Sequence, residues 1–217
     1  MPRPFRAVFW DFGGVITSSP FEAFNRYEEA RGLPRDFLRT TNTINPNDNA
    51  WARFERNDIT PAEFDELFLA ETTARGHAVP GRDVLPLLSG TVRPAMVQVL
   101  RRVKQDFRVA CLTNNIAVGH GPGMSTSDDA ARAVAEVMAL FDFVLESSKA
   151  GVRKPERRFY EIACETMQVE PREVVYLDDL GINLKPAREL GMQTIKVGDP
   201  RLAVAELGRI LGIDFGG

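Results

Sequence analysis

The chain has 217 residues, of which 44% are hydrophobic and 26% charged. This composition is typical of a globular protein and excludes a disordered or fibrous chain. A formal net charge of −3 provides no basic field for nucleic acid, and no apolar stretch approaches the roughly 18 residues of a membrane-spanning helix, so we expect neither a nucleic-acid nor a membrane partner.

The first predicted element is a buried strand. Residues 6–10 form a short apolar run that stops at Asp11 and is followed by two glycines, the pattern of a strand that ends in a turn. Ser19, followed by Pro20 and then Glu22, is typical of an N-cap with a capping box. We therefore expect the first helix to begin there.

A helical insert is predicted to follow. A second capping box, at residues 60–63, begins another helix, and a loop rich in asparagine at residues 40–49 separates the two. No strand pattern interrupts this part of the chain. We expect two domains, a core of residues 1–17 and 90–217 and a helical cap of residues 18–89.

After the insert, strands and helices alternate. Amphipathic helical patterns begin near Pro94, and a glycine-rich connector is predicted at Gly119–Gly123. Apolar runs that predict strands lie at residues 108–112, 143–145, 174–177 and 193–197. This alternation predicts an α/β fold with a doubly wound parallel sheet.

Polar residues follow three of the predicted strands. They are Asp11, Thr113 with Asn114, and Asp178 with Asp179. Because ligands bind outside the carboxyl ends of parallel strands, we expect these groups to line one crevice. Neighbouring carboxylates repel each other unless a cation lies between them, and Mg²⁺ takes such oxygen ligands. Lys154, after a turn that contains glycine, adds a compact positive charge, and together these groups suit a phosphoryl group.

Four motifs resemble those of the haloacid dehalogenase-like (HAD) hydrolase superfamily. They are residues 11–15 (DFGGV), 112–114 (LTN), 151–155 (GVRKP) and 177–183 (LDDLGIN). The resemblance covers nearly the whole chain and is greatest to the phosphatase domain at the N-terminus of soluble epoxide hydrolases. It implies a Rossmann-like core with the helical cap inserted after the first strand. It also implies a Mg²⁺-dependent phosphatase that acts on a small phosphorylated metabolite.

The resemblance implies a role for each motif residue. Asp11 would be the nucleophile that forms an aspartyl-phosphate, with Thr113 and Lys154 as further catalytic residues. The implied substrate-binding residues are Thr113, Asn114 and Lys154. The implied metal ligands are Asp11, Asp179 and the backbone carbonyl of Gly13, supported by Asp178 and Asn183.

Gly13 departs from the family pattern. The phosphatases of the family usually carry an Asp at this position, which serves as general acid and general base. Gly13 keeps the backbone carbonyl but has no carboxylic acid. Since a general acid–base group contributes about 10²–10⁴-fold in rate, we expect slow hydrolysis that favours good leaving groups such as acyl phosphates.

Two other functions remain open. In a 2-haloacid dehalogenase, Asp11 would attack carbon instead of phosphorus, but the dehalogenases of this superfamily need no metal and lack an acidic pair such as Asp178 and Asp179. The absence of an acid at Gly13 also allows a catalytically impaired module that binds phosphate or a protein. The sequence is compatible with a monomer or a homodimer.

A cytoplasmic location is predicted from the first residues and the cysteines. Residues 1–10 carry two arginines but no apolar region of a signal peptide. Cys111 and Cys164 are too few for a disulfide scaffold, and both lie in apolar patterns typical of buried thiols in a reducing compartment.

Overall fold

A parallel sheet forms the centre of the protein. The computed structural model describes residues 4–117, 123–125 and 127–216, so the predicted connector at Gly119–Gly123 lies outside the described residues apart from Gly123. Five parallel strands are arranged in the order β3-β2-β1-β4-β5. They are β1 (Ala7–Trp10), β2 (Arg108–Thr113), β3 (Phe143–Glu146), β4 (Val174–Asp178) and β5 (Gln193–Lys196). The predicted doubly wound α/β fold is confirmed.

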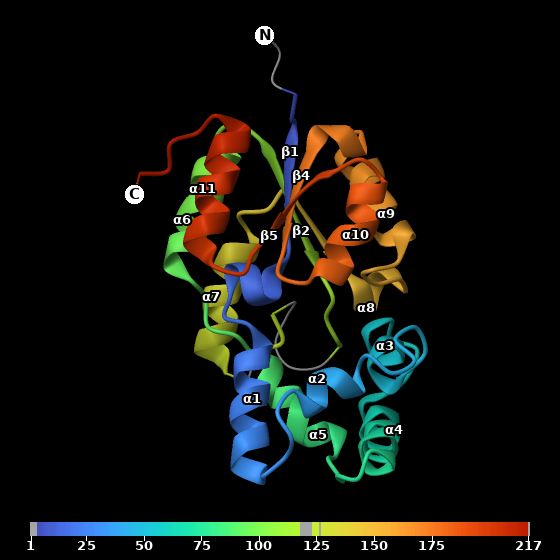
Figure 1. Cartoon of the computed structure of the whole chain (residues 1–217). Coiled ribbons are helices and arrows are strands. Elements are labelled where there is room, and N and C mark those ends of the chain that lie inside the picture. Colours follow the sequence, from blue (N-terminus) through green and yellow to red (C-terminus); the bar gives the residue numbers. More distant parts are fainter. Residues whose placement is uncertain (1–3, 118–122, 126, 217) are drawn as a thin grey trace.

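Helices cover both faces of the sheet (Figure 1). One face is covered by α6 (Pro94–Lys104), α7 (Asp128–Met138) and α11 (Pro200–Leu211), and the other by α9 (Arg157–Met167) and α10 (Gly181–Glu189). Two short elements, α8 (Ser147–Ala150) and η3 (Pro171–Glu173), complete this part of the chain. Successive residues of β1 point to opposite faces, so Trp10 joins one hydrophobic cluster and Phe9 the other. This two-sided burial explains why the sequence of the central strand β1 is apolar throughout.

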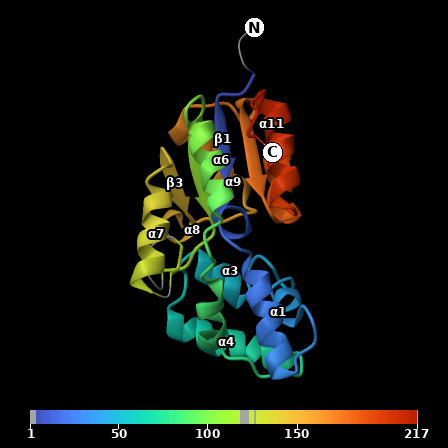
Figure 2. The same ribbon diagram turned by 90° about the vertical axis from the view of Figure 1, so that its left-hand side faces the viewer.

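A group of helices lies beyond the carboxyl ends of the strands (Figures 1 and 2). It consists of α1 (Pro20–Arg31), α2 (Phe37–Thr41), α3 (Ala50–Glu55), α4 (Pro61–Ala74), α5 (Gly81–Val84) and η2 (Leu85–Leu88). We call residues 20–88 the helical block. It has a hydrophobic cluster of its own, in which the ring of Phe64 stacks on the rings of Phe54 and Phe68. The predicted capping box of Thr60 and Glu63 begins α4, as expected.

Two segments that lie side by side connect the helical block to the sheet. The Ser18 amide donates to the Thr91 carbonyl at 2.8 Å, and the Arg93 amide donates to the Ile16 carbonyl at 2.8 Å. Gly90 is required for this approach, because a Cβ atom there would lie 2.6 Å from Thr17 Oγ1. Among the residues that the structure describes, no helix has the length and apolarity to cross a membrane.

Candidate active site

Asp11 lies where β1 ends and the chain turns sharply. Residues Phe12–Ile16 form the tight turn η1, in which Gly13 is extended (φ −68°, ψ 129°) and Gly14 is left-handed (φ 78°). The Phe12 amide donates to Asp11 Oδ1 at 2.6 Å, which fixes the carboxylate at the carboxyl edge of the sheet. The two glycines therefore have different backbone requirements, and only Gly14 adopts a conformation that disfavours side chains.

Replacing Gly14 by Ala is expected to destabilise the protein, whereas Gly13→Ala is not. A Cβ atom at Gly14 would lie 2.2 Å from Asp179 Oδ2, but one at Gly13 meets nothing within 4 Å. We expect Gly14→Ala to lower the free energy of unfolding by about 1–3 kcal/mol, and Gly13→Ala to change it by less than about 1 kcal/mol. Urea denaturation of both variants measures the difference, and equal midpoints would contradict the steric argument.

Lys154 lies at the centre of the site. Its Nζ atom is 2.7 Å from Asp11 Oδ1 and 2.9 Å from Asp178 Oδ2, and the residue is 1% exposed. Burial alone would lower the pKa of Lys154, but the two carboxylates raise it, so the side chain stays an ammonium. Burial raises the pKa of the Asp11 carboxyl, whereas the nearby ammonium of Lys154 acts to lower it. The two residues therefore form a desolvated ion pair.

Asp178 holds Lys154 in place. This carboxylate is fully buried and accepts hydrogen bonds from Asn183 Nδ2 at 3.0 and 3.1 Å and from the Leu180 amide at 2.8 Å. It also accepts one from the hydroxyl of Tyr176, whose pKa is raised by burial and by Asp178 itself. With these donors and Lys154, the oxygens of Asp178 are largely occupied, which gives it a positioning role.

Asp179 is more open than Asp178. Its Oδ2 atom accepts a hydrogen bond from Ser19 Oγ at 3.5 Å. Burial, and then the neighbouring charge of Asp178, raise the pKa of Asp179 to about 6. The predicted capping box at Ser19 is wrong, because the Ser19 side chain makes no capping hydrogen bond to α1 and contacts Asp179 instead.

The three carboxylates are close enough to share a cation. Ligand oxygens of Asp11, Asp178 and Asp179 all lie within 4.8 Å of one another. Three carboxylates beside one ammonium leave an excess of negative charge in a poorly solvated place, which a hard divalent cation would compensate. Since Asp178 is occupied by its donors, the oxygens with capacity for such a cation belong to Asp11 and Asp179.

Thr113 and Asn114 lie at the end of β2, as predicted, and the Asn114 side chain contacts the backbone of Lys154. Its Oδ1 atom accepts from the Lys154 amide at 2.8 Å, and its Nδ2 atom donates to the Lys154 carbonyl at 3.0 Å. Nδ2 also donates to Glu55 Oε2 of the helical block at 3.1 Å. The Asn114 side chain therefore holds the backbone of Lys154, and its part in substrate binding stays a prediction. Thr113 is 3% exposed.

Two residues of the site escaped the sequence analysis, Tyr176 and Glu55. Tyr176 could have been found, because on a strand a residue two positions before Asp178 points to the same face. No comparable signal exists for Glu55, which is 59 positions from Asn114 and belongs to another part of the fold.

A family model described as haloacid dehalogenase-like hydrolase matches residues 5–191. Acyl-CoA dehydrogenase family member 10 of Mus musculus is 32% identical and bifunctional epoxide hydrolase 2 of Mus musculus 31% identical, each over 97% of this chain. The chain spans 19% and 39%, respectively, of the length of those two proteins. The sesquiterpene phosphatase astK of Aspergillus oryzae is 26% identical, over 98% of this chain and 100% of that protein.

Solved structures share the fold. A HAD family enzyme of Bacteroides thetaiotaomicron, in complex with magnesium and inorganic phosphate, has a TM-score of 0.57 at 20% identity, over 90% of this chain and 96% of that chain. A dehalogenase with an intermediate complex has a TM-score of 0.65 at 17% identity, over 99% of this chain and 100% of that chain. At these identities the similarity concerns the fold, and the chemistry has to be argued from the site itself.

Proposed function

This chain belongs to the haloacid dehalogenase-like hydrolase family, and we propose that it is a Mg²⁺-dependent phosphatase of a small phosphorylated metabolite. The observation that carries the proposal is the buried ammonium of Lys154 between Asp11 and Asp178, with the more open carboxylate of Asp179 next to them. This arrangement offers a nucleophile, a positive charge and a cation site at one edge of the sheet. The relative named as a phosphatase, which this chain matches over its full length, and the fold neighbour with magnesium and phosphate support it.

The residues present fit a magnesium ion. Asp11 and Asp179 would hold it through carboxylate oxygens, and Gly13 would contribute its backbone carbonyl. When bound, the ion neutralises the carboxylates and polarises the phosphoryl group. Asp178 and Asn183 support this site indirectly, because they hold Lys154 and the turn at Leu180 in place.

The proposed reaction has two chemical steps, the formation of an aspartyl-phosphate on Asp11 and its hydrolysis by water. A carboxylate oxygen of Asp11 attacks phosphorus, the bond from phosphorus to the leaving oxygen breaks, and that oxygen takes a proton from water. Water then attacks the phosphorus of the aspartyl-phosphate, the bond to Asp11 breaks, and inorganic phosphate leaves. Lys154 neutralises charge on the phosphoryl group in both steps, with Thr113 as a further contact. Residue 13 offers no acid for the leaving group, so acyl phosphates are the best substrates.

We assign the helical block the role of a cap that limits the substrate to small molecules. The block lies over the carboxyl edge of the sheet (Figure 1). Its residue Glu55 accepts a hydrogen bond from Asn114 at the site. The paired segments at residues 16–18 and 90–93 support the proposed division into a cap of residues 18–89 and a core of residues 1–17 and 90–217.

Hydrolysis of acetyl phosphate and p-nitrophenyl phosphate tests the proposal. With Mg²⁺ we expect turnover that is faster on acetyl phosphate, and with EDTA no turnover. Saturating Mg²⁺ is also expected to raise the melting temperature, since a ligand at about 100 times its Kd adds about 2.7 kcal/mol. Asp179→Asn should lose both effects while remaining folded, because it removes an open ligand but leaves the contacts of Asp178 intact.

Two outcomes would replace the proposal. Release of halide from 2-chloropropionate without added metal would indicate a dehalogenase, in which Asp11 attacks carbon. No turnover on any of these substrates, together with a rise in melting temperature with Mg²⁺ and phosphate, would indicate a binding module.

A further inference from the structure

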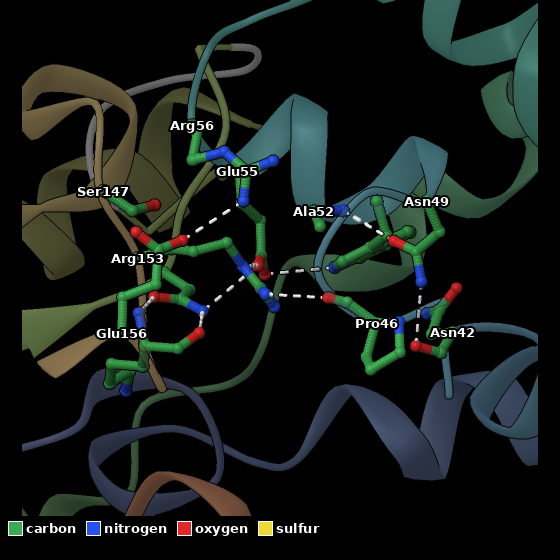
Figure 3. Close-up of polar contacts among 12 residues, drawn as sticks. Asn42, Pro46, Asn49, Ala52, Glu55, Arg56, Ser147, Arg153 and Glu156 are labelled. Atoms are coloured by element: carbon green, nitrogen blue, oxygen red, sulfur yellow. Dashed lines mark hydrogen bonds and ion pairs between the residues drawn. The ribbon is translucent and has the colours of Figure 1, made fainter. Parts of the chain in front are cut away.

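Glu55 connects the helical block to the active site. It is the last residue of α3 and is 8% exposed. Its Oε1 atom accepts from Trp51 Nε1 at 3.0 Å, and its Oε2 atom accepts from Asn114 Nδ2 at 3.1 Å and from Arg153 Nε at 2.5 Å. The carboxylate thus takes donors from its own helix, from the end of β2 and from the loop before α9. Figure 3 shows Glu55 and Arg153 lying against each other.

Two of these three donors control the position of Lys154. Arg153 is the residue before it, and Asn114 holds its backbone on both sides, at the amide and at the carbonyl. Nζ of Lys154 in turn reaches Asp11 and Asp178. Hydrogen bonds therefore connect the helical block to the backbone of Lys154, whose side chain carries the ammonium to the two carboxylates.

We propose that Glu55 is a positioning residue, through which the docked helical block fixes Lys154 for phosphoryl transfer. The proposal rests on the proposed function for its kinetic consequences but not for its structural ones. It accounts for the orientation of the Asn114 side chain, whose three hydrogen bonds join Glu55 to the backbone of Lys154. It also gives the block a role in the chemistry beyond covering the substrate.

Within the described residues, the ion pair of Glu55 with Arg153 is the closer of the two that join residues 55 and 56 to the core. The side chains of Glu55 and Arg153 are 11% and 13% exposed, so neither charge is well solvated. Loss of one partner would leave the other as a buried charge without its counter-ion. Arg56 and Glu156 form the second pair, 3.1 Å apart with side chains 17% and 36% exposed (Figure 3). The second pair joins α3 to the N-terminus of α9 without a hydrogen bond from either side chain to Lys154 within the described part of the chain. It therefore supplies a matched control.

The kinetic test compares Glu55→Gln with Glu156→Gln. Both variants keep the size of the side chain and remove one carboxylate from an ion pair between block and core. We expect Glu55→Gln to lower kcat and kcat/KM on acetyl phosphate together by about tenfold or more, because a misplacement of 1 Å costs up to about 10²-fold. Glu156→Gln is expected to stay within about twofold of wild type. Equal losses in both variants would mean that Glu55 only docks the block, and would overturn the proposal.

A second measurement does not depend on activity. Hydrogen exchange of the peptide that contains Lys154 reports its amide, which donates to Asn114 Oδ1. We expect this amide to exchange about tenfold faster in Glu55→Gln, the loss of one hydrogen bond, and at the wild-type rate in Glu156→Gln. Unchanged exchange in Glu55→Gln would also overturn the proposal. If the wild type hydrolyses no phosphate, the proposed function fails while the exchange data still decide the role of Glu55.

The double variant tests the route through Asn114. If Glu55 acts through this side chain, Glu55→Gln should cost much less when Asn114 is already Ala than it costs alone. Full additivity of the two effects on kcat would contradict the route. Should Glu55→Gln fail to fold, as judged by its melting curve, Glu55→Asp keeps the charge but shortens the side chain by one methylene, and the same exchange and kinetic results are expected of it.

Discussion

Asp11→Asn is expected to abolish turnover while leaving the protein folded. An amide oxygen is a poor nucleophile, and loss of the nucleophile costs roughly 10⁴–10⁶-fold in kcat in enzymes whose groups act as a unit. The fold should survive, because Lys154 keeps its contact with Asp178 at 2.9 Å when Asp11 loses its charge. Asn has the same shape as Asp, so the substitution leaves no cavity at this buried position.

Steady-state hydrolysis of acetyl phosphate and a melting curve of Asp11→Asn check both halves of this expectation. Chemical trapping should also show a covalently bound phosphoryl group on the wild type and none on the variant. Turnover of the variant within tenfold of the wild type would exclude Asp11 as the nucleophile. Because Asn can deamidate to Asp, Asp11→Ala serves as the control, and it should be equally inactive.

Gly13→Asp is expected to increase the rate, most strongly on substrates with poor leaving groups. Residue 13 has an extended backbone (φ −68°, ψ 129°), and a Cβ atom there meets nothing within 4 Å, so neither the backbone nor the first side-chain atom opposes the substitution. A carboxylic acid at this position can protonate the leaving oxygen and then activate water. General acid–base catalysis of this kind contributes about 10²–10⁴-fold.

Gly13→Asn is the matched control, because it has the same shape but cannot donate and accept a proton in turn. We expect Gly13→Asp to raise kcat on alkyl phosphates far more than on acetyl phosphate, whose leaving group needs little protonation, and Gly13→Asn to raise neither. A fourth carboxylate beside Asp11 and Asp179 should also lower the melting temperature in EDTA and increase the gain from Mg²⁺. Equal rates of Gly13→Asp and wild type on alkyl phosphates would show that leaving-group protonation is not limiting.

The sheet could be predicted from the sequence because its information is local. The central strands are short apolar runs, such as Val174–Asp178, and each is ended or followed by a polar residue that breaks the run. The meeting of Asp11, Asp178 and Asp179 then follows from strand direction alone, since parallel strands present their carboxyl ends to one edge. The fold and the central part of the candidate site therefore required no tertiary detail.

The surroundings of these residues could not be predicted, because they depend on contacts between distant parts of the chain. Ser19 has the local pattern of a capping box, yet its side chain contacts Asp179, 160 positions away. The motif of Asn114 gives no sign of Glu55, whose carboxylate accepts a hydrogen bond from the Asn114 side chain across 59 positions of the chain. Local patterns indicate what a side chain can bind, and packing decides which partner it meets.

The paired segments at residues 16–18 and 90–93 make the length of the chain between them a weak constraint on the core. Since Ser18 and Thr91 are already hydrogen bonded, closing the core across this junction needs no particular length of intervening chain. Closure entropy grows only slowly with loop length, by about 0.6 kcal/mol for each doubling. The core can therefore accept inserts of very different size at this point while its strands keep their register. Substrate range could thus diversify by exchange of whole inserts, with the reaction chemistry inherited unchanged.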